Sequence, residues 1–271
     1  MEVFATIKGI NAASGLFLKG DLLYVIGDNS SLLYAYNVKH KQLNTFPLLA
    51  NLSKSAQIPK AEKPDFEALC AHENSLYILG SGSTPKRNRM IEFRFNSRQV
   101  IEHDLTQLYT AMKSAHAIAD EDLNVEGAIY NGSKWYLFNR GNGSGAKNGV
   151  FIINGVDLPT ARNADFIAIP LPKTNTISAS FTDAVLYENQ IYFIAAAEDT
   201  TSTYHDGKIM GSYMGTLDLA TLKLKGFKKI ADHQKFEGLT FLRKKGGQLE
   251  FLICEDSDSE TSSTKIYKVL V

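Results

Sequence analysis

Hydrophobic and polar residues form a pattern that returns five times along this chain. Each repeat starts with an apolar residue, a residue with a side-chain oxygen, a small or polar residue and a second apolar residue. A few strand-forming residues follow, then a polar turn and a second strand. The oxygen-bearing residues, called the key positions below, are Ser14, Glu67, Glu126, Thr182 and Glu237.

The spacing of the key positions indicates the architecture. Successive key positions are 53, 59, 56 and 55 residues apart. In the first four repeats a tyrosine of the second strand comes ten residues after the key position. A period near 55 in a chain of short strands is typical of one repeated supersecondary unit, and most often of a propeller blade. We therefore predict an all-β fold, a five-bladed β-propeller that forms a single domain over residues 1–271.

The two ends of the chain predict how the ring of blades closes. Residues 2–9 have the pattern of a strand without a hairpin partner, and residues 265–271 have that of the third strand in the last repeat. An orphan N-terminal strand can complete the last blade and cover its open edge. We expect residues 2–9 to pair with residues 265–271.

One stretch outside the repeats has helical rather than strand periodicity. Apolar residues recur at helical spacing within residues 105–119, and Asp104 is suited to cap the first turn. We predict a helix between the second and third blades, packed against the outside or one face of the propeller.

The composition of the chain argues against binding to nucleic acids and membranes. Hydrophobic residues make up 44% of the chain, and Lys plus Arg balance Asp plus Glu at 29 each. Such a balance provides no electrostatic footprint for nucleic acid or an anionic membrane. No apolar run has the length of a membrane span, and residues 1–10 are too short and polar for a signal peptide. We expect a soluble monomer that binds neither nucleic acid nor membrane, of unspecified cellular location. Cys70 and Cys254 belong to non-adjacent repeats, so we expect no disulfide between them.

The hairpin geometry places several charged loops beside the key positions. The second strand of each hairpin returns antiparallel, so the loop after it lies at the same end of the blade as the key position. The charged residues that these loops bring to that face include Asp28, Arg87, Arg89, Arg140, Lys147, Asp199 and Asp206.

The key positions themselves suggest a metal site. First strands line the central channel of a propeller, so three carboxylates and two hydroxyls from different blades converge near the axis. Carboxylates held close together repel one another unless a cation lies among them. Calcium takes six to eight oxygen ligands, so we predict a Ca²⁺ site built from Ser14, Glu67, Glu126, Thr182 and Glu237. Alternatively, the glutamates cap the inner strands by bonding backbone N–H groups or water in the channel.

The tetrads Val125-Glu126-Gly127-Ala128 and Phe236-Glu237-Gly238-Leu239 resemble those of calcium-dependent apyrases, the soluble calcium-activated nucleotidases. The resemblance implies an axial calcium held by Ser and Glu residues of successive blades, with Thr182 in place of a serine. It also covers residues 139–141, 147–149 and 198–199, which would lie in loops that help bind nucleotide phosphates. Similar Glu-Gly-Leu repeats occur in phytase-like propellers.

Two functions follow as expectations. The first is a metal-dependent hydrolase of phosphoesters or phosphoanhydrides acting on a small phosphorylated molecule. Its catalytic residues would be Asp28, Arg140, Asp199 and Asp206, and its substrate-binding residues Arg87, Arg89 and Lys147. The second is a non-catalytic binding propeller whose metal only ties the blades together and whose face binds an unidentified ligand. The propeller fold serves both, so only the site can decide between them.

Overall fold

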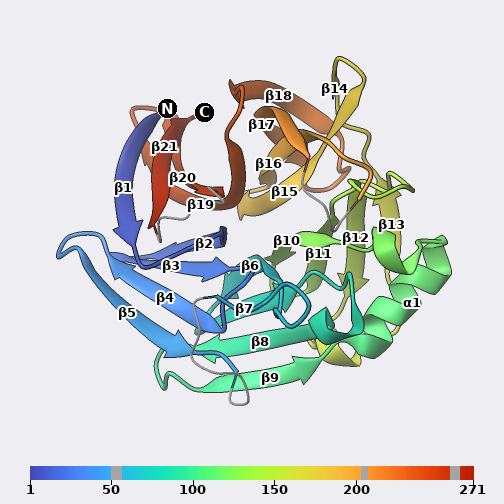
Figure 1. The fold of residues 1–271 in the computed structure, drawn as a ribbon, viewed down its shortest axis with the longest axis horizontal. Coiled ribbons are helices and arrows are strands. Elements are labelled where there is room, and N and C mark those ends of the chain that lie inside the picture. Colours follow the sequence, from blue (N-terminus) through green and yellow to red (C-terminus); the bar gives the residue numbers. More distant parts are fainter. Residues whose placement is uncertain (50–56, 203–206, 257–262) are drawn as a thin grey trace.

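The computed structural model describes residues 1–49, 57–202, 207–256 and 263–271. Five antiparallel sheets stand around a common axis, which confirms the five-bladed propeller (Figure 1). Blade one contains β2 (Ala13–Lys19), β3 (Leu22–Gly27), β4 (Leu32–Asn37) and β5 (Gln42–Pro47). Blade two contains β6 (Phe66–His72), β7 (Ser75–Gly80), β8 (Arg89–Arg94) and β9 (Val100–Asp104). Blade three contains β10 (Val125–Tyr130), β11 (Lys134–Asn139), β12 (Gly149–Asn154) and β13 (Asp165–Ala168).

The last two blades differ from the first three in one respect each. Blade four contains β15 (Ile177–Tyr187), β16 (Gln190–Asp199), β17 (Lys208–Asp218) and β18 (Leu224–Ala231), with the short β14 (Lys173–Thr174) added beside β15. This fifth strand was not predicted. Blade five contains β19 (Lys235–Lys245), β20 (Gln248–Asp256), β21 (Ser263–Leu270) and β1 (Glu2–Lys8). The described residues also form three 3-10 helices: η1 (Pro85–Arg87), η2 (Asp120–Asp122) and η3 (Leu158–Thr160).

The N-terminal strand closes the ring as predicted. β1 pairs antiparallel with β21, from Glu2 opposite Lys268 to Lys8 opposite Ser263. The two termini therefore lie together at the outer edge of blade five (Figure 1). An ion pair of 2.5 Å between Glu2 and Lys268 joins the two strands near their ends.

Every key position lies at a β-bulge. In each inner strand the pairing with the second strand skips the key residue, as where Phe66 faces Gly80 and Ala68 faces Leu79. The same shift occurs at the other four key positions. A bulge leaves one residue out of the ladder and turns its side chain in a new direction. The repeated sequence pattern therefore corresponds to a β-bulge that recurs in the inner strand of each blade.

Close packing of the inner strands explains the glycines that follow Glu126 and Glu237. A Cβ on Gly127 would lie 3.0 Å from the backbone nitrogen of Ala184 in blade four. A Cβ on Gly238 would lie 2.9 Å from backbone atoms of blade one, at Gly15 and Leu16. Neighbouring inner strands approach one another too closely there for a larger residue without a shift of the backbone.

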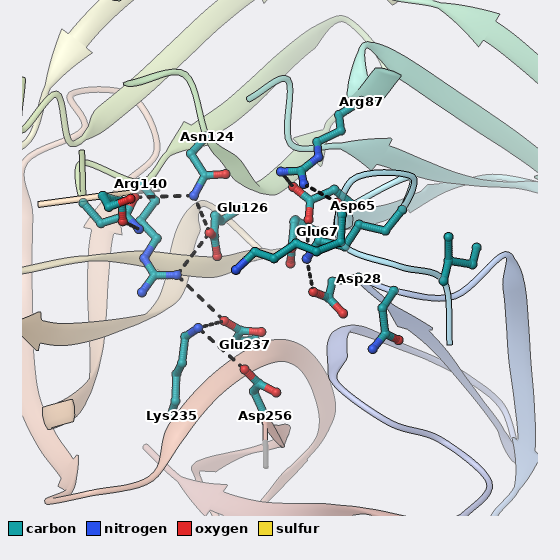
Figure 2. A pocket seen from close by; sticks show the side chains of 16 residues that line it. Asp28, Asp65, Glu67, Arg87, Asn124, Glu126, Arg140, Lys235, Glu237 and Asp256 are labelled. Carbon is teal, nitrogen blue, oxygen red and sulfur yellow. Dashed lines mark hydrogen bonds and ion pairs between the residues drawn. The ribbon is translucent and has the colours of Figure 1, made fainter. Parts of the chain in front are cut away.

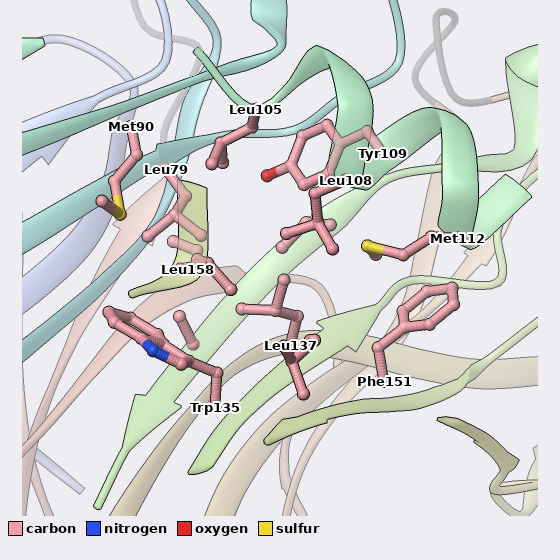
Figure 3. Close-up of a cluster of buried hydrophobic side chains, with 14 of the residues drawn as sticks. Leu79, Met90, Leu105, Leu108, Tyr109, Met112, Trp135, Leu137, Phe151 and Leu158 are labelled. Atoms are coloured by element: carbon pink, nitrogen blue, oxygen red, sulfur yellow. The ribbon is translucent and has the colours of Figure 1, made fainter. Parts of the chain in front are cut away.

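Helix α1 (Thr106–His116) lies between blades two and three, as the sequence predicts. It packs against both blades and covers a cluster of buried apolar side chains (Figure 3). It is shorter than the predicted range of 105–119 because Ala117 adopts the left-handed conformation, with φ of 50°. Asp104 accepts the Thr106 N–H at 2.8 Å, but the residue at the cap position is Leu105.

Among the described residues, no helix has the length and apolar character that a membrane span requires. Cys70 and Cys254 are both buried and free, as expected.

Candidate functional site

A cavity of about 260 Å³ opens at the end of the channel where the inner strands begin (Figure 2). We call it the axial cavity. All five blades contribute to it. The contributing segments are the loops after β3, β7, β11 and β16, the starts of β6, β10 and β19, and the end of β20. The charged residues that line it are Asp28, Lys60, Lys63, Asp65, Glu67, Arg87, Glu126, Arg140, Lys235, Glu237 and Asp256.

One wall of the axial cavity holds a group of three carboxylates. Single oxygens of Asp28, Asp65 and Glu67 all lie within 4.8 Å of one another, and we call these residues the carboxylate group. The Lys63 ammonium contacts Asp28 and also lies 2.6 Å from Asp65. Arg87 donates to Asp65 at 2.7 Å from the other side. The carboxylate group is thus only partly neutralised.

Two positions in this group have unused acceptor oxygens. Glu67 is 9% exposed and makes no hydrogen bond or ion pair with any described residue. The Oδ1 atom of Asp28 is buried without a hydrogen-bond partner among the same residues. Buried polar atoms almost always have a partner, so Asp28 Oδ1 marks a place where one is needed, and the Glu67 carboxylate lines the cavity beside it.

The opposite wall is organised around Arg140. Its guanidinium contacts Glu198, lies 3.1 Å from Glu126 and 3.8 Å from Glu237. Lys235 lies 2.6 Å from Glu237 and 3.6 Å from Asp256. On this side the Oε2 atom of Glu126 is also buried and without a hydrogen-bond partner in the described part of the chain.

Burial changes the proton affinity of the unpaired carboxylates. Desolvation raises the pKa of Glu67 well above its ordinary value, and the nearby charges of Asp65 and Glu126 raise it further. Desolvation also raises the pKa of Glu126 to about 7, although Arg140 opposes the change. For Asp28 burial again raises the pKa, against the effect of Lys63. A cation beside these groups would favour their ionised forms.

The five predicted metal ligands divide into two sets. The three glutamates line the axial cavity. The Ser14 hydroxyl donates to the carbonyl of Phe66 at 2.5 Å, and the Thr182 hydroxyl donates to the carbonyl of Phe236 at 2.7 Å. These bonds join blade one to blade two and blade four to blade five. A carboxylate cannot donate such a bond, which leaves the glutamates to face the cavity. No backbone N–H of the described residues caps these glutamates.

The predicted catalytic and substrate-binding residues are only partly brought together. Asp28, Arg87 and Arg140 line the axial cavity, but carboxylates already hold both arginines. Arg89 lies on β8, where it pairs with Glu102 at 2.9 Å. Lys147 and Asp199 are not among the residues that line the cavity. Asp206 lies outside the described residues.

Sequence reasoning missed several residues of the cavity, namely Lys63, Asp65, Asn124, Lys235 and Asp256. A signal for three of them was present. Asp65, Asn124 and Lys235 each come two residues before a key glutamate, and residues two apart on a strand share a face. Lys63 belongs to a turn, so no such periodicity could locate it.

Residues 9–271 match the model of DUF6929, described as a family of unknown function. No curated protein sequence matches the chain.

Solved structures share the fold at low sequence identity. Glutaminyl cyclase of Myxococcus xanthus is 10% identical with a TM-score of 0.56, and the alignment covers 99% of this chain and 96% of that one. The major Malassezia sympodialis allergen Mala s 1 is 10% identical with a TM-score of 0.55, covering 99% and 92%. For Kuenenia stuttgartiensis hydrazine synthase the identity is 9% and the TM-score 0.45, and the chain covers 57% of that longer chain and 92% of itself. The similarities to glutaminyl cyclase and Mala s 1 show the propeller fold alone and do not confirm the resemblance to apyrases or phytase-like propellers.

Proposed function

This chain belongs to the DUF6929 family, and we propose that it is a cation-binding propeller that holds a divalent ion, calcium, in the axial cavity. One observation carries the proposal. Asp28, Asp65 and Glu67 bring three carboxylate oxygens within 4.8 Å of one another, and Glu67 has no partner among the described residues. An all-oxygen set of ligands is suited to a hard cation.

The residues around the cavity fit such an ion. Calcium accepts irregular arrangements of carboxylate oxygens, whereas magnesium requires near-ideal octahedral geometry. Glu67 and Asp28 Oδ1 offer unused oxygens on one wall, and Glu126 Oε2 offers another on the opposite wall. An ion bound at the carboxylate group would supply a partner for Asp28 Oδ1 and for the unpaired Glu67 carboxylate. It would also polarise an oxygen atom of a small ligand that enters the cavity.

The contacts of the arginines favour binding over phosphate chemistry. Arginine binds phosphate best through two parallel N–H donors. In this cavity the Arg87 donors contact Asp65, Ser83 and the Lys60 carbonyl, and the Arg140 donors contact Glu126 and Glu198. Both arginines therefore stabilise the carboxylates around them. We infer a role in binding a small polar ligand beside the ion, with the ion joining blades one and two.

A metal-dependent hydrolase of phosphoesters or phosphoanhydrides is the second candidate. The observation in its favour is that Arg87, Arg140 and the carboxylate group all face one cavity. In this case Asp28 would orient the attacking water, and a phosphate would have to displace carboxylates from the arginines. Release of phosphate from nucleoside diphosphates and triphosphates, with calcium and with chelator, tests this candidate directly.

Thermal unfolding of chelator-stripped protein tests the proposed cation. A ligand present at a hundredfold excess over its dissociation constant stabilises the folded state by about 2.7 kcal/mol. For a domain of this size, that gain raises the melting temperature by roughly 5–10 °C. Calcium should produce this rise, and magnesium should produce a smaller one.

The Glu67→Gln variant should lose most of the calcium-dependent rise, because the amide keeps the shape but not the charge. Glu73→Gln is the matched control, since Glu73 is exposed at the far end of the same hairpin. A wild-type melting temperature that stays constant across millimolar calcium contradicts the proposal.

A further inference from the structure

Lys63 holds the position in the axial cavity that a bound cation would need. Its ammonium contacts Asp28 and lies 2.6 Å from Asp65, which are two of the three members of the carboxylate group. The Lys63 residue is only 9% exposed. Its ammonium donates a hydrogen bond to Oδ2 of Asp28. A lysine ammonium is a compact positive charge, comparable to a bound monovalent ion.

We propose that Lys63 is a tethered competitor for the metal: the cation displaces its ammonium from the carboxylate group, and the lysine side chain moves out of the cavity. This inference rests on the proposed cation site. Two positive charges a few ångströms apart repel strongly when little water lies between them. Asp28 and Asp65 therefore cannot bind the Lys63 ammonium and a divalent ion tightly at the same time. In the absence of metal, Lys63 keeps the carboxylates from repelling one another.

The backbone around Lys63 allows this exchange without disturbing the carboxylate group. Ile58 is buried and its N–H donates to the Asn29 carbonyl at 2.7 Å, whereas the Asp65 N–H donates to the Asp28 carbonyl at 3.1 Å. Both ends of the segment are therefore fixed. Between them, residues 60–62 are exposed in a turn. The long Lys63 side chain can rotate from this turn into solvent while Asp65 stays in place.

Arg87 provides an internal contrast because it has no comparable freedom. Besides Asp65, it donates to Ser83 at 2.6 Å and to the Lys60 carbonyl at 3.2 Å. Its side chain is 5% exposed, and its guanidinium is held on several sides. Arg87 thus remains a fixed partner of Asp65, and Lys63 is the cation that can leave.

The contact of Lys63 should set the affinity for metal. A ligand that binds only the fraction of molecules without the competing contact has its dissociation constant raised by the inverse of that fraction. For a contact present in about nine molecules in ten, this relation gives about tenfold tighter apparent binding of calcium when the contact is removed. The lysine thereby restricts the site to ions that attract the carboxylates more strongly than an ammonium does.

Calcium titrations by calorimetry on stripped protein test this inference. Lys63→Met should bind calcium about tenfold more tightly than the wild type. Lys134→Met is the matched control, because Lys134 is exposed at the far end of β11 and its loss makes the same change in net charge. This control should bind calcium as the wild type does.

A second measurement uses the wild type alone and does not depend on how well the variant folds. Calcium should raise the rate at which the Lys63 amine is acetylated by an amine-reactive ester several-fold, as followed by peptide mass spectrometry. Lys235, which pairs with Glu237 on the opposite wall, should show no comparable increase.

The outcomes separate the two proposals. Absence of calcium binding to both wild type and Lys63→Met overturns the cation site itself. Equal or weaker binding by Lys63→Met, together with unchanged acetylation of Lys63 in the wild type, overturns the competitor role and leaves the cation site standing.

Discussion

Blades two and three build two neighbouring regions with opposite chemistry. Under helix α1 they contribute Leu79, Met90, Trp135 and Leu137 to an apolar cluster from which solvent is almost fully excluded (Figure 3). At the channel end the same blades contribute Glu67, Arg87, Glu126 and Arg140 to the axial cavity (Figure 2). Both regions are buried, so the difference between them is one of chemistry rather than depth.

The two regions make opposite contributions to stability. Burial of apolar side chains stabilises the fold at about 25 cal/mol for each Å² removed from water. Buried charges gain less, because their loss of hydration offsets most of their mutual attraction. At Glu126 desolvation raises the pKa against the attraction of Arg140, and at Glu67 desolvation and the neighbouring carboxylates raise the pKa together. The buried charges of the axial cavity thus reduce the stability of an otherwise well-packed propeller. Such a region is suited to ligand binding.

Replacement of Arg140 by Met should have the largest effect. The variant leaves Glu126, Glu198 and Glu237 buried without their shared partner, and loss of one side of a buried ion pair costs about 4 kcal/mol. Urea denaturation measures the loss. Arg162→Met is the control, because Arg162 is exposed and bonds only to backbone carbonyls, and should change stability by less than about 0.5 kcal/mol. A loss below about 1 kcal/mol for Arg140→Met would show that the charges of the cavity are well hydrated.

Truncation of Leu108 should have the next largest effect and should leave the cavity intact. Leu108 is completely buried under α1, so Leu108→Ala removes apolar contacts, leaves a void and costs about 3 kcal/mol. Leu224→Ala, at a residue that is 38% exposed, should cost much less. The calcium-dependent gain in melting temperature should be the same in Leu108→Ala as in the wild type. A smaller gain would mean that the apolar cluster and the axial cavity are coupled.

The pH dependence of stability should distinguish the cavity from the apolar cluster with a smaller effect. Glu126 has a pKa of about 7 in the folded protein against an ordinary value of 4.5, so folding takes up a proton between these values. Stability of chelator-stripped protein should therefore fall as pH rises, by roughly 2–3 kcal/mol from pH 5 to pH 8. The raised pKa of Glu67 acts in the same direction.

The Glu126→Gln variant should flatten this pH profile, because it removes the titrating group. Leu108→Ala should shift the whole profile downward without changing its slope. Stability of stripped wild-type protein that rises between pH 5 and pH 8 would contradict the assignment of uncompensated carboxylates to the cavity.

The repeat in the sequence predicts the blades because their register is local. In the first four hairpins the residue three after the key position faces the tyrosine ten after it, as Phe17 faces Tyr24 and Cys70 faces Tyr77. Closure by residues 2–9 was predictable for a similar reason, since an unpaired strand needs an edge. Strand β14 and the early end of α1 at Ala117 could not be predicted in this way, because they depend on local backbone conformations that the hydrophobic pattern of the sequence does not indicate.

The site was less predictable because side-chain direction at a bulge depends on hydrogen-bonding capacity. Ser14 and Thr182 can donate, and each bonds the carbonyl of a neighbouring blade. Glu67 occupies the same place in the repeat but only accepts, so it faces the cavity. Lys63 reaches the cavity from a turn that lies 35 residues after its partner Asp28. Only the folded structure brings such residues together.

A crystal structure of the protein grown with calcium, with anomalous scattering to locate the ion, tests the central claim most directly. The cation site predicts an anomalous peak in the axial cavity with oxygens of Glu67 and Asp28 at about 2.3–2.6 Å from it. Lys63 should then have left its position between Asp28 and Asp65. A cavity without an anomalous peak at saturating calcium, with Lys63 still contacting both aspartates, would contradict the claim.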